Sequence, residues 1–354
     1  MTPIRQQPLR AAVIGCGAIA YEHLPFVATS PLADLVAVCD MSPAMAAAAG
    51  ERFGAGATYT DVATLLAQVT PDIVHVLTPP HTHDAIVRQA LAAGAHVVCE
   101  KPMTGTEAET AGLIHAADLA GKVLVESRNL LWNDAVIALR KLIADGRLGR
   151  VAECDVLLSL DFLAGPFGDR NLSGRAVALP AGAVHDFLPH LIYLFEALSG
   201  VGDEYEARGF LQNRTANPRA GFDHIDALID DGRVRGRLRI ATDAYPEAFR
   251  VVVRGTEGTA ETDLYNPYLR YDAAPNVGKR APFGQVANGK ALRRAGWANL
   301  RNKIMQHGTM HGLPRMLEAV YRAIIDGTPP PITATEMIAT ARMCDRLVAL
   351  ADAS

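Results

Sequence analysis

The chain has 354 residues, of which 49% are hydrophobic and 20% charged, and its formal net charge is −4 at pH 7. This balance is ordinary for a globular protein of two domains and lacks the basic excess typical of nucleic-acid binding. The five cysteines are scattered without metal-site spacing, and no apolar run reaches the roughly 18 residues that span a bilayer. With no signal-peptide pattern, these features predict a cytoplasmic protein with no nucleic-acid partner and no membrane insertion.

The first 126 residues alternate apolar strands with alanine-rich helices. The predicted strands are 9–15, 34–40, 72–78, 96–100 and 123–127, and the predicted helices are 18–29, 42–53, 81–93 and 106–120. The strands are almost continuously apolar, which indicates that both of their faces are covered by helices. We therefore predict a doubly wound parallel sheet over residues 1–126.

A glycine motif follows the first predicted strand and opens the first helix. It reads Gly15-x-Gly17-x-x-Ala20, with Ala18 and Ile19 inside it. Gly15 permits a tight turn, Gly17 lets the backbone approach a pyrophosphate, and Ala20 is small enough for close helix–strand packing. The motif predicts a dinucleotide site that includes Gly15, Gly17, Ala18 and Ile19.

Other polar groups at strand ends complete this predicted site. Asp40 closes the second strand, where a carboxylate accepts from a ribose 2′-hydroxyl and repels a 2′-phosphate, so we predict NAD rather than NADP. Thr78 and Pro79 begin a turn that leaves the sheet, and they are further candidates for cofactor contact. His83 in the same loop can cap the next helix or face the cofactor.

The stretch from Val97 to Met103 ends an apolar strand in Glu100, Lys101 and proline. Lys and Glu are seldom fully buried unless they are paired. A strand that ends in this way therefore opens into a ligand crevice, and Glu100 and Lys101 are predicted to lie beside the cofactor.

The pattern changes after residue 126. The predicted strands 151–162, 234–242 and 248–255 alternate apolar and polar residues, with a hairpin turn at 255–258 and helices at 133–149 and 334–352. Alternation is typical of an antiparallel sheet with one packed face. We predict an α+β domain over 127–354 with a large, mostly antiparallel sheet, its last helix packing back near the first domain. The free face of the sheet predicts a homodimer or homotetramer.

Three segments resemble the glucose-fructose oxidoreductase / inositol dehydrogenase (Gfo/Idh/MocA) family: GCGAIAYEH, TPPHTHDAIVRQALAAGAHVVCEKP and AGAVHDFLPHLIYLFEALSG. The likeness covers the first 200 residues well and the remainder in outline. It implies a Rossmann domain followed by an α/β domain, and NAD(P)-dependent oxidation or reduction of a hydroxyl group on a sugar, cyclitol or related compound. It also implies a catalytic set of Lys101, Asp186 and His190.

The chemistry of these three side chains agrees with the catalytic set that the resemblance implies. Alcohol oxidation needs a hydride acceptor and a group that removes the hydroxyl proton, and an imidazole such as that of His190 does this near neutral pH. Asp186 lies four residues earlier, so it shares a helix face with His190 and can orient the imidazole or bind a substrate hydroxyl. Lys101 can hydrogen-bond the reacting oxygen or act as the base.

Alternative interpretations of these residues stay open. Asp186 and His190 can instead satisfy a buried helix, and with His185 they are ligand types for a metal, although consecutive ligands do not share a helix face. His307 and His311 have an HxxxH spacing without the glutamate of a metalloprotease helix, which favours a pocket-lining or structural role. We predict no metal site.

The segment before the Asp–His helix is expected to line the substrate pocket. Arg170 and Arg175 can bind a carboxylate or phosphate, or they can be ordinary surface arginines. The family usually has a run of glycines here, whereas this chain has LPAGAVHD. This difference leaves the identity of the substrate undetermined. Asn129 follows the last predicted strand of the first domain and is a candidate near the nicotinamide.

The stretch 274–305 is rich in basic residues and has no acidic residue. Within it, KALRRAGWANLRNKIM (290–305) can form a helix with a basic face and one tryptophan, which serves as a lid over an anionic substrate, an oligomer contact, a membrane-surface helix or a solvated charged face.

The sequence as a whole predicts an NAD-dependent oxidoreductase that moves a hydride between a secondary hydroxyl carbon and nicotinamide. The alternatives are a glycoside-processing enzyme that retains NAD for transient oxidation and a non-catalytic regulator that binds NAD and a sugar.

Overall fold

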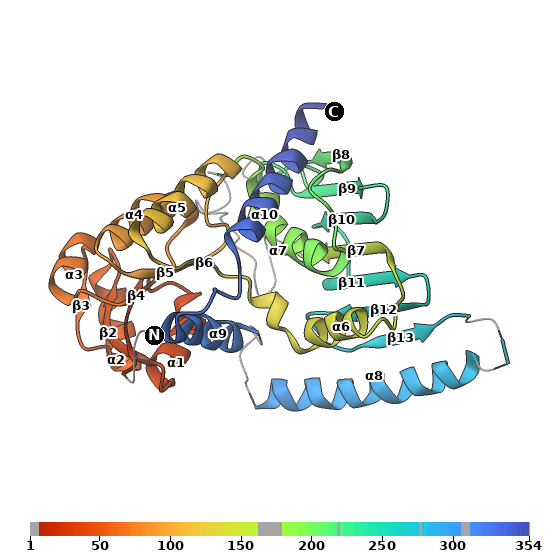
Figure 1. The fold of residues 1–354 in the computed structure, drawn as a ribbon, viewed down its shortest axis with the longest axis horizontal. Coiled ribbons are helices and arrows are strands. Elements are labelled where there is room, and N and C mark those ends of the chain that lie inside the picture. The colour runs from red at the N-terminus through yellow and green to blue at the C-terminus, as the bar shows by residue number, and fades with distance from the viewer. Residues whose placement is uncertain are drawn as a thin grey trace. The chain divides into compact units, whose positions relative to one another are not determined.

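The computed structural model describes residues 7–161, 179–217, 220–275, 278–279, 281–305 and 312–353 (Figure 1). The chain divides into two compact units. The first contains residues 1–129 and 312–341, and the second contains residues 130–311 and 342–354. Within the described residues, no helix is long and apolar enough to cross a membrane.

The first unit is built on a six-stranded sheet in the order β3-β2-β1-β4-β5-β6, and all of its strand pairs are parallel. The strands are β1 (Leu9–Ile14), β2 (Ala33–Cys39), β3 (Thr58–Tyr59), β4 (Ile73–Val76), β5 (His96–Cys99) and β6 (Leu124–Glu126). This order reverses direction between β1 and β4, as in a Rossmann fold, and ligands of such sheets bind at the carboxyl ends of the strands beside this point. The predicted doubly wound parallel sheet is confirmed.

Helices follow the strands of this sheet and pack on it. They are α1 (Ala20–Thr29), α2 (Pro43–Phe53), α3 (Val62–Val69), α4 (His83–Ala92) and α5 (Glu107–Ala120), with the 3₁₀ turn η1 (Pro80–Thr82) before α4. Side chains of Ser42, Asp61 and Thr106 accept a hydrogen bond at the N-termini of α2, α3 and α5. These caps explain why the helices begin at those residues.

The C-terminal part of the chain adds α9 (Leu313–Asp326) and the beginning of α10 (Ala334–Val348) to the first unit. Leu313, Met316, Leu317, Val320 and Tyr321 are buried, and their spacing forms one apolar helix face. Helix α9 contacts α1. The rest of α10 and the turn η3 (Ala349–Ala353) belong to the second unit.

The second unit contains a seven-stranded sheet in the order β13-β12-β11-β7-β10-β9-β8. Its strands are β7 (Val151–Ser159), β8 (Glu206–Gln212), β9 (His224–Asp230), β10 (Arg235–Ala241), β11 (Ala248–Gly255), β12 (Gly258–Asp263) and β13 (Arg270–Ala273). All neighbours are antiparallel except β7 and β10. The predicted mostly antiparallel sheet is confirmed.

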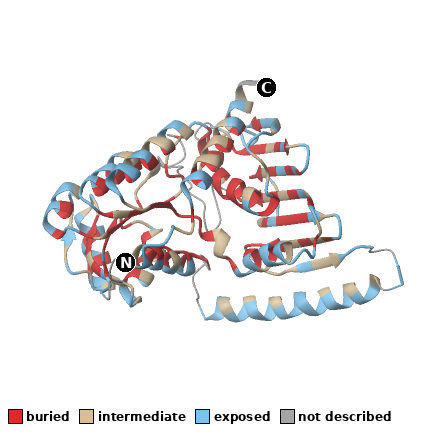
Figure 2. Ribbon diagram, viewed as in Figure 1, coloured by how far each residue is buried: buried red, intermediate tan, exposed pale blue. Residues whose placement is uncertain are grey.

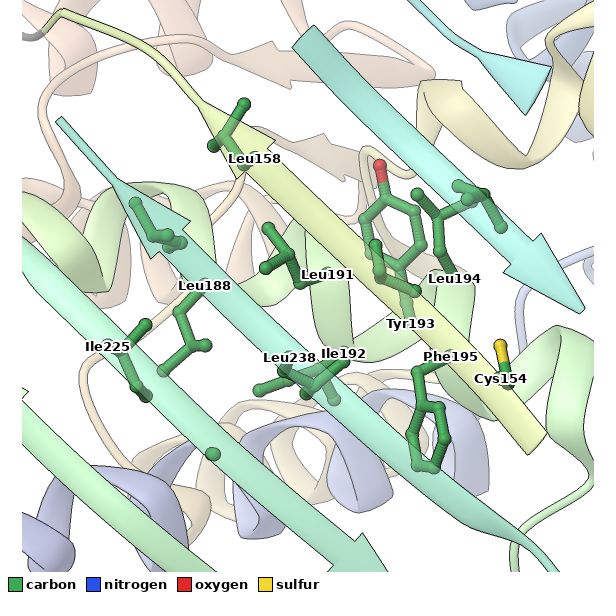
Figure 3. Packing of buried hydrophobic residues seen from close by; sticks show 14 of the residues in the cluster. Cys154, Leu158, Leu188, Leu191, Ile192, Tyr193, Leu194, Phe195, Ile225 and Leu238 are labelled. Atoms are coloured by element: carbon green, nitrogen blue, oxygen red, sulfur yellow. The ribbon is translucent and has the colours of Figure 1, made fainter. Parts of the chain in front are cut away.

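Helix α7 (Gly182–Ser199) forms the core of this unit against the middle of the sheet, as Figure 3 shows. Leu188, Leu191, Ile192 and Phe195 of α7 are buried with apolar residues of the central strands. A Cβ on Gly236 of β10 would lie 2.2 Å from the Phe195 ring, so the absence of a side chain there makes room for the phenylalanine. This packing fixes the helix that carries Asp186 and His190.

The opposite face of the sheet is charged. Arg254 on β11 lies 3.0 Å from Glu153 and 3.2 Å from Asp155 of β7, and Arg237 pairs with Asp226 across β10 and β9. Cross-strand ion pairs of this kind satisfy polar side chains on a face that the core does not cover. The unit also contains α6 (Asp134–Ala144), the turn η2 from Leu130 onward (Asn129–Trp132), and α8 (Ala281–Ile304).

Candidate functional site

The loop after β1 meets the loop after β4 at the point where the strand order reverses. Gly15 has φ +94°, which favours glycine, and a Cβ there would lie 2.8 Å from the Leu77 carbonyl group and 2.9 Å from the amide nitrogen of Thr78. Any larger residue at position 15 would separate the two loops. The sequence prediction of a tight turn at Gly15 therefore has a physical cause in this contact.

The backbone after Gly15 presents free donors. The N–H groups of Gly17, Ala18 and Ile19 make no hydrogen bond within the described residues, and Ile19, at the N-terminus of α1, provides no side-chain cap. All three residues are accessible. Free amides at a helix start attract phosphate oxygens, so this loop fits the pyrophosphate of a dinucleotide.

Asp40 lies directly after β2, beside the same loop. Its Oδ2 accepts from the amide of Cys16 at 2.8 Å, and its Oδ1 accepts from the amide of Ser42 at 2.8 Å. Each carboxylate oxygen has a further lone pair, and the side chain is partly exposed. The carboxylate is therefore held in place with capacity to accept from a ribose hydroxyl.

His83 joins two loops beside the site and is itself completely buried. Its Nε2 lies 2.7 Å from the Thr78 carbonyl oxygen, and its Nδ1 lies 3.0 Å from that of Pro102. Burial lowers the pKa of His83, although the surrounding carbonyl oxygens and Glu100 oppose this shift. The buried position favours a role in holding the loops over direct contact with a cofactor, while Thr78 and Pro79 remain partly exposed.

Glu100 ends a buried chain of hydrogen bonds through two histidines. Its Oε1 lies 3.0 Å from Nε2 of His23, whose Nδ1 lies 3.0 Å from Nδ1 of His75. Nε2 of His75 lies 2.8 Å from the Tyr321 hydroxyl on α9. Both imidazoles and the phenol are fully buried, so the chain is shielded from water.

The ionisation of Glu100 fixes the direction of the first hydrogen bond in this chain. Burial lowers the pKa of His75 well below its ordinary value and raises the pKa of Tyr321. Burial alone would raise the pKa of Glu100. The hydrogen bonds with His23 and Ser127 and the nearby charge of Lys101 have the larger effect, so the net pKa shift is downward. An ionised Glu100 can only accept, so His23 donates to it through Nε2–H.

Lys101 follows Glu100 at the end of β5 and is partly exposed. Its amide lies 3.3 Å from Oε2 of Glu100, and the amide of Met103 donates to Glu126 Oε1 at 3.0 Å. Glu126 also pairs with the buried Arg128 at 3.1 Å. Two buried carboxylates thus hold the backbone on either side of Lys101 and Pro102.

Helix α7 carries the other predicted catalytic residues. His190 is buried and Asp186 is partly exposed, and the Nδ1 atom of His190 lies 2.6 Å from the hydroxyl of Tyr193, one helical turn later. If Nδ1–H donates to Tyr193, the lone pair is on Nε2, where a base needs it. Tyr193 is a residue that sequence reasoning missed, because its aromatic ring reads as core.

We expect Tyr193→Phe to lower kcat/KM about three- to tenfold, the effect of one lost hydrogen bond. The affinity for NAD should not change, because the hydrogen bond orients the imidazole only. Initial rates, titration with NAD and urea unfolding of both proteins check this. An unchanged kcat/KM with unchanged stability would contradict the positioning role.

His185, next to Asp186, belongs to the core instead. It is buried, its Nε2 lies 3.5 Å from the Cys344 sulfur, and its Nδ1 has no hydrogen-bond partner within the described residues. Burial lowers the pKa of His185 to about 4, against an opposing effect of Asp186. No group of three or more His, Cys, Asp or Glu in the described part of the chain is arranged for a metal ion.

The lowered pKa of His185 predicts acid sensitivity. The unfolded imidazole binds a proton below about pH 6.5 whereas the folded one does not, so the stability present at higher pH is lost as the pH falls toward 4. Between pH 7.5 and 5 this amounts to about 2 kcal/mol. Urea unfolding at both pH values should show that His185→Leu removes this part of the pH dependence. An unaltered dependence would refute a neutral buried histidine.

Four residues that the sequence analysis considered lie outside the described residues: Arg170, Arg175, His307 and His311. Asn129 is buried at the start of η2. The structure adds residues that the sequence did not indicate: His23, His75, Glu126, Arg128, Tyr193 and Tyr321. Of these residues, only His23 could have been suspected from the sequence, because it lies in the segment GCGAIAYEH. No residue close to it in sequence indicates its hydrogen-bond partners.

The fold and the phosphate-binding loop define a dinucleotide-binding protein with a Rossmann domain. Residues 9–127 match the family described as "Oxidoreductase family, NAD-binding Rossmann fold", and residues 136–261 match the "GFO/IDH/MocA C-terminal domain". The chain belongs to the Gfo/Idh/MocA family of oxidoreductases.

Individual relatives agree with this assignment. The dTDP-3,4-didehydro-2,6-dideoxy-alpha-D-glucose 3-reductase of Streptomyces violaceoruber is 30% identical over 88% of this chain and 93% of its own length. D-glucoside 3-dehydrogenase of Escherichia coli K12 is 34% identical over 41% of each chain. For two further relatives the match spans 40% and 37% of their own length, well under two thirds.

A solved structure shares the whole fold. The WlbA dehydrogenase from Bordetella pertussis, solved in complex with NADH and UDP-GlcNAcA, has a TM-score of 0.81 at 21% identity. The similarity covers 99% of this chain and 97% of that one. At this identity the likeness establishes the architecture of both units.

Proposed function

We propose that this protein is an NAD-dependent oxidoreductase that transfers a hydride between nicotinamide and a secondary hydroxyl carbon of a sugar, cyclitol or sugar derivative. The observation that carries the proposal is the Glu100–Lys101 pair at the carboxyl end of β5, in the sheet whose β1 loop offers free amides to a pyrophosphate. The named sugar reductase and dehydrogenase relatives support the substrate class.

The proposed chemistry divides between the two units. Bound NAD supplies the hydride acceptor. Lys101, partly exposed and held by its neighbours, donates a hydrogen bond to the reacting oxygen and stabilises its developing negative charge. His190 accepts the hydroxyl proton at Nε2, and Asp186 binds a substrate hydroxyl from the same helix.

The cofactor-binding residues act through different groups. Gly17, Ala18 and Ile19 offer amides, Asp40 accepts from ribose, and Thr78 with Pro79 lines the neighbouring loop. Glu100 and Asn129 lie at the ends of the strands nearest the nicotinamide in this proposal, and His83 supports the loops from behind. Arg170 and Arg175 are proposed to bind an acidic group of the substrate.

The position of Asp40 supports NAD over NADP. Its ionised carboxylate, fixed by two amides, would repel a 2′-phosphate. Asp40→Asn keeps an oxygen acceptor but removes the charge, so we expect the preference for NAD over NADP in kcat/KM to fall roughly tenfold. Initial rates with each cofactor measure the preference, and Asp34→Asn serves as the control. An unchanged ratio would contradict the role of this charge.

We also propose a cytoplasmic homodimer or homotetramer. Cys16, Cys39, Cys99, Cys154 and Cys344 are all buried free thiols, which suits a reducing compartment. The seven-stranded sheet has a face that the core does not cover, and the exposed Leu228 on it supports association through that sheet. Sedimentation velocity tests the size of the assembly.

The direct test of the activity is a substrate screen. Purified protein is mixed with aldoses, cyclitols, uronic acids or nucleotide sugars and with NAD or NADP, and absorbance of the reduced nicotinamide is followed. Growth of this absorbance with at least one compound is expected. Glycoside cleavage with retained NAD and no net reduction would favour the glycoside-processing alternative. Sugar and NAD binding without any turnover would favour the regulator.

A further inference from the structure

Helix α8 has no buried residue along its whole length of 24 residues. Figures 1 and 2 show it as a long, mostly exposed helix beside β13. It contains Lys290, Arg293, Arg294, Arg301 and Lys303 and no acidic residue. Helix α8 is therefore not stabilised by burial of an apolar face.

One face of α8 attaches it to the sheet through polar contacts. Asn288 exchanges hydrogen bonds with the backbone of Tyr271, Asn299 donates to the Pro267 carbonyl, and Lys303 donates to Asn266. The partly buried residues recur at helical spacing along this face: Ala281, Gly284, Asn288, Ala295, Asn299 and Asn302. The helix is thus anchored with a defined face turned outward.

The opposite face, which we call the outer face, combines large apolar and cationic side chains. Its apolar residues are Phe283, Val286, Trp297, Leu300 and Ile304, and its cations are Lys290, Arg293, Arg294 and Arg301. Phe283 is 74% exposed, Trp297 68% and Ile304 70%. An apolar set of this size on a helix face is typical of an interaction surface.

The charge of the outer face selects the partner. None of its four cations has an ion-pair partner in the part of the chain that the structure describes. Self-association of α8 about a two-fold axis is disfavoured, because Lys290, Arg293 and Arg294 lie near the middle of the helix and would meet their own copies. The partner must therefore be anionic and must also accept apolar side chains.

A lipid surface meets both conditions. Trp and Phe beside Leu and Ile enter the boundary between headgroups and acyl chains, while Lys and Arg reach the phosphates. Nucleic acid would bind the cations but offers little to Val286, Leu300 and Ile304. We propose that the outer face of α8 binds the surface of an anionic phospholipid bilayer, with the helix lying in the plane of the membrane and without spanning it.

The test uses the full-length protein and phospholipid vesicles, with no cofactor or substrate, so its outcome is independent of the proposed catalytic function. Sedimentation with vesicles of about 30% phosphatidylglycerol should carry the protein down, and vesicles of phosphatidylcholine alone should not. Binding should weaken strongly between about 0.05 M and 0.5 M salt. Replacing Lys290, Arg293 and Arg294 with Gln should lower the partition coefficient about a hundredfold, near fivefold for each charge.

The apolar part is tested separately. Trp297→Ser with Ile304→Ser should lower binding at least about tenfold at constant net charge. The matched control replaces Arg140, Lys141 and Arg208, which are exposed cations of the same unit, with Gln and should bind as the unchanged protein does. Circular dichroism verifies that α8 remains helical.

Four results would overturn the proposal. The first is no salt-sensitive binding to anionic vesicles. The second is equal loss of binding in the control variant. The third is binding to single- or double-stranded DNA that exceeds binding to vesicles and depends on the same three cations. Self-association that is lost in the outer-face variants, without vesicle binding, would identify a second copy as the partner instead.

Discussion

Replacing Lys101 with methionine should lower kcat about a thousandfold with the best substrate of the screen. The change removes the ammonium that donates to the reacting oxygen, and a single positioned acid–base group contributes about 10² to 10⁴. Methionine keeps a similar length and leaves the backbone contacts of Glu100 and Met103 in place. Stopped-flow measurement of nicotinamide reduction gives the chemical step directly.

Binding measurements separate this effect from a loss of cofactor. Titration calorimetry should show that Lys101→Met still binds NAD, because the free amides and Asp40 are unchanged. Lys122→Met, on a partly exposed lysine of the same unit, is the control and should retain full activity. A kcat that stays within a few fold in Lys101→Met would remove Lys101 from the chemistry.

Replacing Arg128 with methionine should lower the free energy of unfolding by about 3–5 kcal/mol. Arg128 is 2% exposed, and its guanidinium contacts Glu126 and the Glu336 carbonyl oxygen. The substitution would leave the buried carboxylate of Glu126 without its cation, which is more costly than removing the pair. Urea unfolding at neutral pH measures the loss.

A double variant tests whether the unpaired carboxylate of Glu126 causes this loss of stability. Glu126→Gln with Arg128→Met removes both charges and keeps an oxygen that accepts from the amide of Met103, so most of the lost stability should return. A single Arg128→Met variant as stable as the unchanged protein would show that this ion pair contributes nothing. Equal losses in the single and paired variants would locate the effect in packing instead.

The first unit was largely predictable because its signals are local. The glycine motif, the apolar strands and Asp40 each lie within a short stretch of chain, and each determines its own turn or strand. The prediction missed β3, which has two residues, and α3, whose eight residues follow closely after it. Elements this short leave little periodicity to detect.

The buried network around Glu100 could not be predicted, because its contacts are distant in sequence. His75 and Tyr321 are 246 residues apart, and α9 itself was not among the predicted helices. In the second unit the strands β8 and β9 were also missed. In β8 only Leu211 is buried, and in β9 the exposed Leu228 stands between the buried Ala227 and Ile229, so neither strand shows a clear alternation of apolar and polar residues.

Helix α8 illustrates a different limit. The sequence predicted a helix from residue 290, whereas the helix begins at Ala281. Gly284 and Gly289 lower the helix propensity of its first turns, which explains why the prediction missed them. Which of its faces points outward depends on the asparagine contacts with β13 and with Pro267 before it. Composition alone favoured a solvated charged face and also left a lid, an oligomer contact and a membrane-surface helix open.

The catalytic proposal requires that one unit's ammonium and the other unit's imidazole act on a single oxygen. The measurement that tests this most directly is a crystal structure of the protein with NAD and the best substrate of the screen. We expect Nζ of Lys101 and Nε2 of His190 each within about 3.2 Å of the same substrate oxygen, above the nicotinamide. A structure with these two atoms in separate cavities, or with Nε2 of His190 facing the apolar core, would contradict it.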